Sequence, residues 1–265
     1  MSTVSGSVSS QATNPAADAE SARLCAFWTD RYREFSLSES GWLGAGEAQN
    51  ALVYRCKAQA LRRALTELRL AQPSRFTVLD AGCGQGFFAE FYAREFAGCD
   101  YTGVDIASRA IEHLRARFPA HRFVAADVSS WRAIAKTAFD VIQCFEVLHL
   151  FVDDRSVERT LGNLASQLEP GGVMLVTAAL PHRTVQPSHY TRHLSRDAFL
   201  AMVTRAGLRV RAVRAMYYWL PDGGPSNRHL RYVMTRLGPR ALYLTDRAAL
   251  AVGVPRWFQG GRIRR

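Results

Sequence analysis

Apolar residues along the chain fall into short continuous runs that alternate with longer segments in which they recur at helical spacing. The runs predict buried strands at 76–79, 100–106, 121–127, 139–144 and 173–178. Runs of this length are typical of strands that are covered on both faces. The helical segments lie at about 87–96, 108–118 and 154–168. Strands that alternate with helices predict an α/β fold around a mostly parallel central sheet flanked by helices.

The segments on either side of this alternation predict further elements. Before the first strand, helices are expected between 23 and 70, with a Ser- and Gly-rich loop at 36–46. After the fifth strand, a helix from Ser195 to Gly207 leads to a sixth strand at about 208–218, and the tail beyond it has helical spacing. We expect three regions: a disordered leader (1–22), a main domain with an N-terminal helical cap (23–220) and an Arg-rich helical extension (221–265).

Three glycines at alternate positions, Gly82, Gly84 and Gly86, separate the first strand from its helix. Glycine allows a positive φ and lets a ligand lie against bare backbone, and the start of the helix offers unpaired N–H groups. The spacing is G-x-G-x-G, followed by the bulky Phe87. It therefore differs from the G-x-G-x-x-G of dinucleotide sites and from the Gly-Lys-Ser/Thr ending of phosphate loops.

The stretch Thr77–Phe88, which reads TVLDAGCGQGFF, resembles the first motif of class I S-adenosylmethionine (SAM)-dependent methyltransferases. Three further features of that family follow in matching order. They are an Asp that ends the second strand, an Asp after the third, and Leu-x-Pro-Gly-Gly before the fifth. The resemblance covers about residues 76–178 and implies a Rossmann-like fold, SAM as cofactor and methyl transfer. The alternative for the glycine run alone is a turn in some other α/β protein.

Two aspartates carry the expected contacts with the cofactor. Asp105 lies 21 positions after Gly84, a distance at which an acidic residue can accept hydrogen bonds from ribose hydroxyls; capping of the next helix is the alternative, for which Ser108 is better placed. The resemblance places Asp127 on the adenine amine and the Val128 N–H on the ring, whereas a structural Asp127 would cap a helix at 129–131. The cofactor-binding residues implied by the resemblance are Asp80, Gly82, Cys83, Gly84, Gly86, Asp105, Ile106, Asp127, Val128 and Glu146.

Candidate catalytic residues follow the fourth and fifth strands. The family often has Glu-Val-Leu-Glu-His-Leu after the fourth strand; this chain is one residue shorter, so His149 does not map cleanly onto the family histidine. His149 is either a base, since imidazole titrates near neutral pH, or a structural histidine. The linker at 179–195 holds His182, His189 and Tyr190, and similar methyltransferases place substrate contacts there. For a hydroxyl acceptor the candidate bases are His149, His182 and His189, with Tyr190 orienting. A solvated loop is the alternative, and the lack of Asp, Glu or Cys in the linker argues against a metal.

Aromatic side chains before the first strand are further candidates. Resemblance places Tyr32, Trp42 and Tyr54 near the substrate, but large aromatic residues are core residues first. We therefore favour packing of these three side chains against the core over contact with substrate.

Charge is distributed unevenly. Residues 205–265 hold 13 Arg, no Lys and two Asp, whereas residues 1–204 hold 21 basic and 21 acidic residues, so the whole net charge of +11 lies in the last quarter. An Arg-rich region can bind RNA phosphates, an anionic membrane surface or an acidic substrate, although such runs are most often solvated.

Other features limit the function classes. There is no run of eighteen apolar residues and no secretory signal, and five scattered cysteines without a C-x-x-C pair favour reduced thiols and a cytoplasmic location. No Asn/Asp-Pro-Pro-Tyr/Phe signature of nucleobase amine methylation is present, and Cys144 lacks the Pro-Cys context of cytosine enzymes. We therefore expect methyl transfer from SAM to O, S or N of a small molecule. The alternatives are an RNA methyltransferase that uses the Arg-rich region and a non-catalytic SAM-binding protein. The acceptor and the oligomeric state are not evident.

Overall fold

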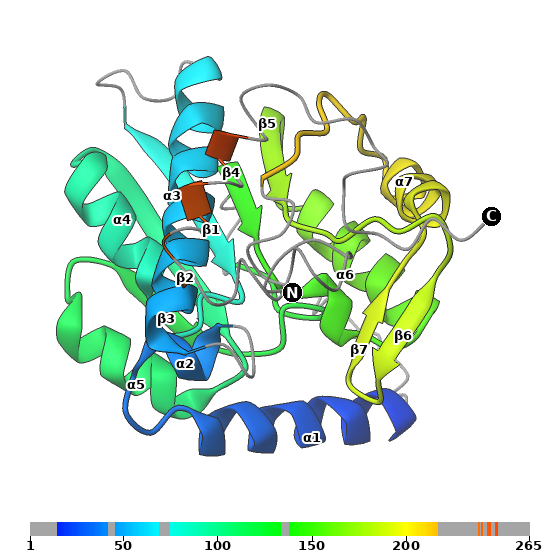
Figure 1. Cartoon of the computed structure of the whole chain (residues 1–265), viewed down its shortest axis with the longest axis horizontal. Helices are drawn as coiled ribbons and strands as arrows, with labels where there is room; N and C mark the ends of the chain where they lie inside the picture. Colours follow the sequence, from blue (N-terminus) through cyan, green and yellow to red (C-terminus); the bar gives the residue numbers. More distant parts are fainter. Residues whose placement is uncertain are drawn as a thin grey trace, which may run out of the picture.

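A computed structural model describes residues 15–41, 46–68, 75–133 and 138–216, together with positions 238, 240, 243, 244, 247 and 248. A five-stranded sheet lies at its centre, with helices on both faces (Figure 1). The strand order is β3-β2-β1-β4-β5, and every pairing is parallel. The strands are β1 (Phe76–Ala81), β2 (Cys99–Asp105), β3 (Arg122–Ala125), β4 (Phe139–Cys144) and β5 (Leu168–Val176). The predicted fold class is confirmed.

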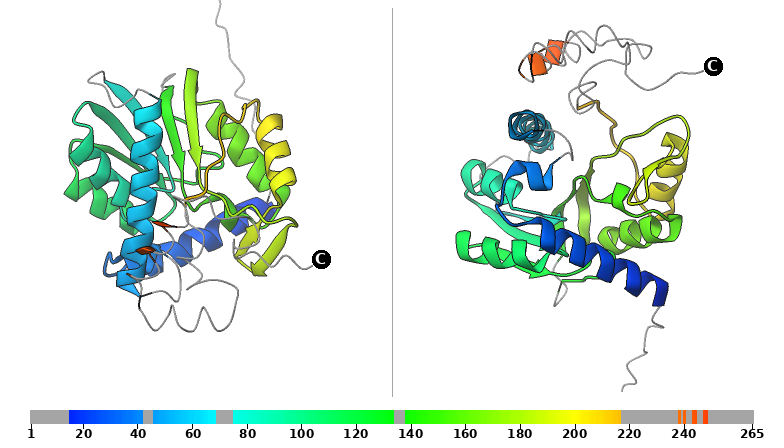
Figure 2. Two further views of the ribbon diagram at one scale, coloured as in Figure 1. Left: turned by 45° about the horizontal axis from the view of Figure 1, so that its top comes forward. Right: turned by 60° about the horizontal axis from the view of Figure 1, so that its bottom comes forward.

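Both faces of the sheet are buried. On one face the core includes α3 (Glu47–Glu67), α4 (Phe87–Glu95) and α5 (Ser108–Arg117); on the other it includes α6 (Asp154–Ala165) and α7 (Arg196–Arg205). Figure 2 shows these two helical layers from further directions. Successive strand residues point to opposite faces, so Val78 packs with the first layer and Leu79 with the second, and neither is exposed. Burial on both sides explains the continuous apolar runs.

The strand order reverses beside β1. β2 and β3 lie on one side of it, and β4 and β5 on the other. In an open parallel sheet, the loops at the carboxyl ends of the strands diverge at such a point and leave a crevice where ligands bind. The glycine loop after β1 and the loop after β4 therefore face one another across this crevice.

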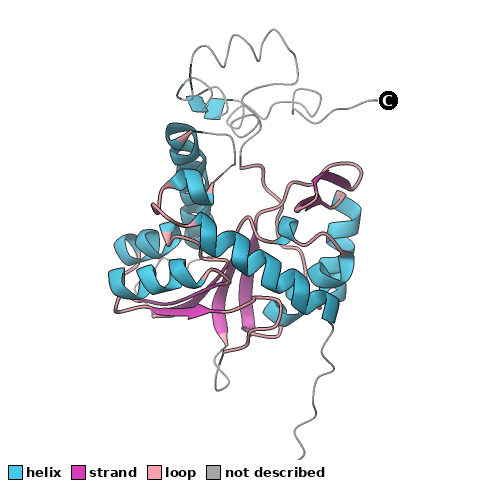
Figure 3. Ribbon diagram, turned by 90° about the horizontal axis from the view of Figure 1, so that it is seen from below, coloured by secondary structure: helices cyan, strands magenta, loops and turns pink. Residues whose placement is uncertain are grey.

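An N-terminal helix crosses that edge of the sheet. α1 (Pro15–Arg31) runs along the lower side of the molecule from the β6–β7 hairpin to α5, and the view from below shows it in front of the strands (Figures 1 and 3). It is followed by the short α2 (Leu37–Ser40). Because α1 begins at Pro15, a residue that suits the first helical position, the last part of the predicted leader is helical. Residues 1–14 lie outside the described residues.

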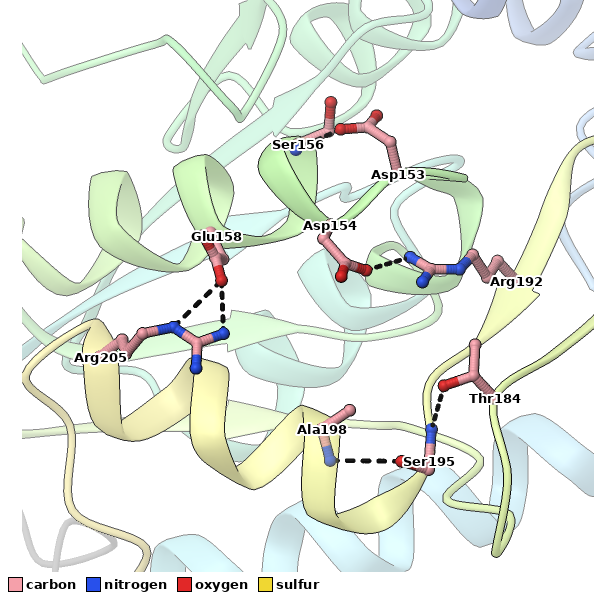
Figure 4. A network of polar contacts seen from close by, with 9 residues as sticks. All are labelled: Asp153, Asp154, Ser156, Glu158, Thr184, Arg192, Ser195, Ala198 and Arg205. Carbon is pink, nitrogen blue, oxygen red and sulfur yellow. Dashed lines mark hydrogen bonds and ion pairs between the residues drawn. The ribbon is translucent and has the colours of Figure 1, made fainter.

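The linker after β5 forms an antiparallel hairpin, β6 (Val185–Ser188) and β7 (Thr191–His193), where the sequence predicts only a connecting loop. Figure 4 shows how polar contacts hold this region on α6. Arg192 forms an ion pair with Asp154 at 2.6 Å, and Arg205 pairs with Glu158. The Ser195 hydroxyl caps α7 by accepting the Ala198 N–H at 3.3 Å.

Two strand predictions differ from the structure. β5 begins at Leu168, because Phe139 pairs with Leu168 and Val141 with Val173, so the Pro-Gly-Gly segment forms an irregularity within the strand. The predicted sixth strand is wrong over 208–216, which has no regular structure. Val210 and Val213 are 42% and 52% exposed there, so their alternation with arginines does not mark a buried face.

The rest of the predicted sixth strand, Trp42 and most of the predicted tail helices lie outside the described residues. Among the helices that the structure does describe, none combines the length and the apolar character needed to cross a bilayer.

Candidate active site

A cleft of about 950 Å³, counted with its open mouth, lies at the carboxyl edge of the sheet. The walls come from α1, α3, the glycine loop and the loops that follow β2, β3 and β4. The crevice expected from the strand order is therefore a real cavity.

The glycine loop forms the floor of the cleft. Gly82 and Gly84 have φ values of +83° and +51°, which side chains rarely adopt. A Cβ added to Gly82 would lie 2.1 Å from Cγ2 of Val147, and one on Gly84 would lie 3.2 Å from the Tyr32 hydroxyl. The loop therefore fits between Val147 and Tyr32 only as bare main chain, as predicted from the glycine spacing.

Asp105 joins the ends of two strands and lines the cleft. Its carboxylate accepts the Gly84 N–H at 2.8 Å and the Ala107 N–H at 2.9 Å. Burial raises the pKa of Asp105, although these hydrogen bonds oppose the shift. The prediction that Ser108 caps α5 is wrong. The N-cap residue is Ala107, and the N–H of Ala107 donates to the Asp105 carboxylate. Each carboxylate oxygen has a second lone pair, so a ribose diol can still bind.

Asp80 lies beneath the loop. It is 1% exposed and accepts hydrogen bonds from the Tyr101 hydroxyl at 2.6 Å and from Nε2 of Gln143 at 3.1 Å. Burial raises the pKa of Asp80 to about 7. Asp80 is not among the residues that line the cleft. The cofactor contact implied for Asp80 stays a prediction, and its observed role is to hold the end of β1.

The loop after β3 gives the cleft a polar corner between apolar walls. Asp127, Ile106 and Val128 all line it. Oδ1 of Asp127 accepts the Ser129 N–H at 2.8 Å, and Oδ2 accepts the Ser21 hydroxyl at 2.7 Å. Asp127 thus caps a turn, whereas the helix expected at 129–131 is not formed. A carboxylate beside two aliphatic side chains suits an adenine ring with its exocyclic amine, so the contact predicted for Asp127 is compatible with capping.

α1 covers this end of the cleft. Leu24, Trp28 and Tyr32 contribute to the lining, and the Cys25 thiol donates to the Ile106 carbonyl at 3.2 Å. Tyr32 is 4% exposed, so it is both a packed residue and a cleft residue. The same holds for Tyr54 on α3, which lies in the core and lines the opposite end.

A buried lysine, Lys57 on α3, lines the cleft beside Tyr54. No role for it is predicted from the sequence. Its side chain is 5% exposed, and its Nζ lies 3.6 Å from Oε1 of Glu146 and 4.6 Å from the centre of the Tyr54 ring. Burial lowers the pKa of Lys57, and the carboxylate of Glu146 opposes this shift. The position of Lys57 in the sequence could have indicated that it is buried, because Val53, Lys57 and Leu61 recur every four residues on the buried face of α3.

Glu146 is held in an unusual backbone conformation. Its φ is +59°, and such residues persist where the surroundings fix them. The Glu146 N–H donates to Oγ1 of Thr177 at 2.8 Å, and that hydroxyl donates to Oε1 of Glu146 at 3.0 Å. Burial alone would raise the pKa of Glu146, but Lys57, His149 and Thr177 together lower it. An ionised carboxylate is therefore fixed in the cleft wall.

The four candidate catalytic residues are not brought together. His149 lies on the short helix η1 (Leu148–Leu150) with its ring 5.6 Å from that of His193, and burial lowers its pKa. His182 and His189 are exposed, while Tyr190 stacks on Phe27 of α1 at 6.2 Å.

None of these four side chains lines the cleft, so their catalytic roles stay predictions. In the part of the chain that the structure describes, no three potential metal ligands converge.

A sequence profile described as a methyltransferase domain matches residues 54–236, which is more than half of the chain. Trans-aconitate 2-methyltransferase of Paracidovorax citrulli is 32% identical over 114 residues, 43% of this chain and 42% of the relative. Ubiquinone biosynthesis O-methyltransferase of Albidiferax ferrireducens is 36% identical over 100 residues, 36% of this chain and 38% of the relative. The match thus spans less than half the length of either protein.

A solved structure shows the same fold. Magnesium protoporphyrin IX methyltransferase of Synechocystis PCC 6803, with bound SAM, aligns with a TM-score of 0.54 over 73% of this chain and 88% of the other, at 14% identity. At that identity the likeness concerns the fold alone. Together with the profile match, these findings confirm the family resemblance: the chain belongs to the methyltransferase-domain family of class I SAM-dependent methyltransferases.

Proposed function

We propose that this protein transfers a methyl group from SAM to O, S or N of a small molecule. One observation carries the proposal: a single cleft is lined by two sets of side chains with different chemistry. The glycine loop, Asp105 and Asp127 line what we take as its first end, and Tyr54, Lys57 and Glu146 line what we take as its second. A donor and an acceptor can therefore meet in one cavity.

The residues of the first end fit SAM. Asp105 retains lone pairs for the ribose hydroxyls, Asp127 for the adenine amine, and the bare backbone of the loop admits the sugar and the chain beyond it. When bound, SAM supplies a methyl carbon that is already electrophilic because it is attached to a sulfonium. The chain's part is to orient the acceptor, which can account for about 7–11 kcal/mol of a barrier.

The second end fits a small acceptor. Phe87, Phe88 and Phe145 contribute apolar side chains to its lining. The names of the relatives point the same way, since one acts on trans-aconitate and another is an O-methyltransferase of ubiquinone biosynthesis. The five free cysteines favour the cytoplasm.

An acceptor screen tests the proposal. Purified protein is incubated with SAM and with thiols, phenols, amines, carboxylic acids or RNA, and release of S-adenosylhomocysteine is measured. We expect release with at least one small-molecule class. Release with RNA alone would favour the RNA methyltransferase, and tight SAM binding without any release would favour a non-catalytic protein.

A further inference from the structure

We propose that Glu146 contacts the acceptor and that the cleft selects an uncharged hydroxyl as the nucleophile while excluding a carboxylate. The proposal rests on the methyl transfer proposed above and assigns the acceptor chemistry. It also gives Glu146 a role different from the cofactor contact implied by the family resemblance.

The exposure of the Lys57–Glu146 pair decides which charge an acceptor meets. Both side chains line the cleft, but that of Glu146 is 40% exposed and that of Lys57 only 5%. A molecule that enters the cleft therefore meets the carboxylate. The ammonium is already directed to that carboxylate and to the face of Tyr54.

The position of Glu146 is fixed rather than adaptable. Thr177 at the end of β5 holds both its N–H and its Oε1, and Thr177 is itself tied to the Cys144 carbonyl at 3.3 Å. Left-handed conformations at residues other than glycine are strained, and they cluster at functional sites. Here it turns the carboxylate of Glu146 into the cleft beside the glycine loop.

The charge of Glu146 is also fixed. Lys57 faces it from α3 and His149 from η1, and Tyr54 on α3 is the nearby phenol. Burial raises the pKa of Tyr54 to about 12, so the phenol stays neutral. Lys57 is therefore a positioning residue that keeps Glu146 ionised, and its own contact with solvent is slight.

An ionised carboxylate beside apolar side chains discriminates between acceptors. A hydroxyl can donate a hydrogen bond to it, whereas a second carboxylate would be repelled by its like charge. The aromatic side chains around it, Phe87, Phe88 and Phe145, suit an apolar acceptor body.

A hydroxyl acceptor also needs the base that Glu146 provides. Its oxygen forms a bond to the methyl carbon while the carbon–sulfur bond breaks and leaves its electron pair on sulfur. The proton of the hydroxyl, made strongly acidic by alkylation of its oxygen, passes to Glu146 and then to solvent. A carboxylate whose pKa lies below its usual value is sufficient for such an acidic proton, but would not deprotonate an alkylammonium.

A pair of probes with one apolar body tests the selection. A naphthol and the matching naphthoate are titrated by calorimetry into protein saturated with S-adenosylhomocysteine. We expect the naphthol to bind at least tenfold more tightly. In Glu146→Gln, which keeps the shape and an oxygen for Thr177, this preference should fall below threefold. Glu112→Gln on the exposed face of α5 is the matched control and should behave like the wild type.

Lys57 variants add a readout that a purely structural role would not change. Without the ammonium the pKa of Glu146 rises, so the pH below which naphthol binding weakens should shift upward by at least one unit in Lys57→Met. Lys57→Arg should restore the wild-type profile. Thermal unfolding of each variant shows whether it is folded.

The outcomes separate the two proposals. Equal or tighter binding of the naphthoate, no binding of the naphthol, or an unchanged preference in folded Glu146→Gln would overturn the role of Glu146. A tenfold loss of S-adenosylhomocysteine affinity in Glu146→Gln with the preference unchanged would make Glu146 a cofactor ligand instead. Failure of the wild type to bind S-adenosylhomocysteine would refute the proposed function, and the probe comparison on the free protein would still test Glu146.

Discussion

Two aspartates one strand apart illustrate how position decides a side chain's role. Asp80 and Asp105 both end central strands and both are buried, at 1% and 8% exposed. The carboxylate of Asp80 accepts hydrogen bonds from Tyr101 and Gln143 beneath the loop, whereas that of Asp105 accepts backbone N–H groups and faces the cleft. The first therefore supports the sheet, and the second is available to a ligand.

The raised pKa of Asp80 predicts a dependence of stability on pH. The folded value of about 7 lies above the ordinary value of 3.8, so the unfolded chain loses this proton first. The stabilisation from Asp80 is complete below the lower value and is lost as the pH rises through the higher one. In urea titrations, the unfolding free energy of the wild type should fall relative to that of Asp80→Asn by up to about 1.4 kcal/mol per pH unit between these values. A difference that does not change with pH would contradict this.

The sequence predicts the role of those residues whose contacts are made with neighbours in the chain. The glycine loop and Asp105 were predictable because their geometry follows from a strand, a turn and a helix that are adjacent in the chain. Lys57 was not, because it lies on a helix rich in arginine and its partner Glu146 is far away in sequence. Nothing near Glu146 in the sequence shows that Thr177 holds it at a positive φ.

Elements were predictable where both faces are buried. The five strands and their helices follow from continuous apolar runs, whereas the predicted sixth strand failed because its apolar residues face solvent over 208–216. The hairpin β6–β7 was missed because its strands are short, because β6 is largely exposed, and because contacts with α6 and η1 hold the hairpin in place. Local sequence carries little of that information.

α1 lies against the cofactor end of the cleft. Ser21 contacts Asp127 and Cys25 contacts the Ile106 carbonyl, while Tyr32, directly after the helix, lies over Gly84. We expect α1 to open for SAM to enter and to be held more firmly once it is bound.

Hydrogen exchange tests this role of α1. Saturation with SAM should slow exchange of the α1 amides by about tenfold or more, which corresponds to about 1.4 kcal/mol. The amides of α6, which lies on the other face of the sheet, serve as the internal control and should change little. Unchanged exchange in α1 at saturating SAM would show that the helix does not respond to the cofactor.

The whole molecule combines a basic chain with an acidic cleft. The net charge is +11, and its excess lies in residues 205–265. Among the cleft-lining residues, by contrast, Asp105, Asp127 and Glu146 outnumber Lys57. A cavity lined by carboxylates attracts a sulfonium and repels a phosphate chain, which supports SAM as donor and disfavours RNA as acceptor.

We expect SAM to bind in the cleft beside the glycine loop through Asp105. Calorimetric titration of SAM into the wild type, Asp105→Asn and Asp140→Asn measures this contact. Asp140 also accepts a backbone N–H within the sheet, from Thr77 at 2.8 Å near the opposite ends of the strands, so it is a matched control. A hydrogen bond to a charged group contributes about 1.5–3 kcal/mol, so Asp105→Asn should bind SAM at least tenfold more weakly. Asp140→Asn should bind within about twofold of the wild type. Equal affinity in Asp105→Asn, or no binding by the wild type, would contradict the account.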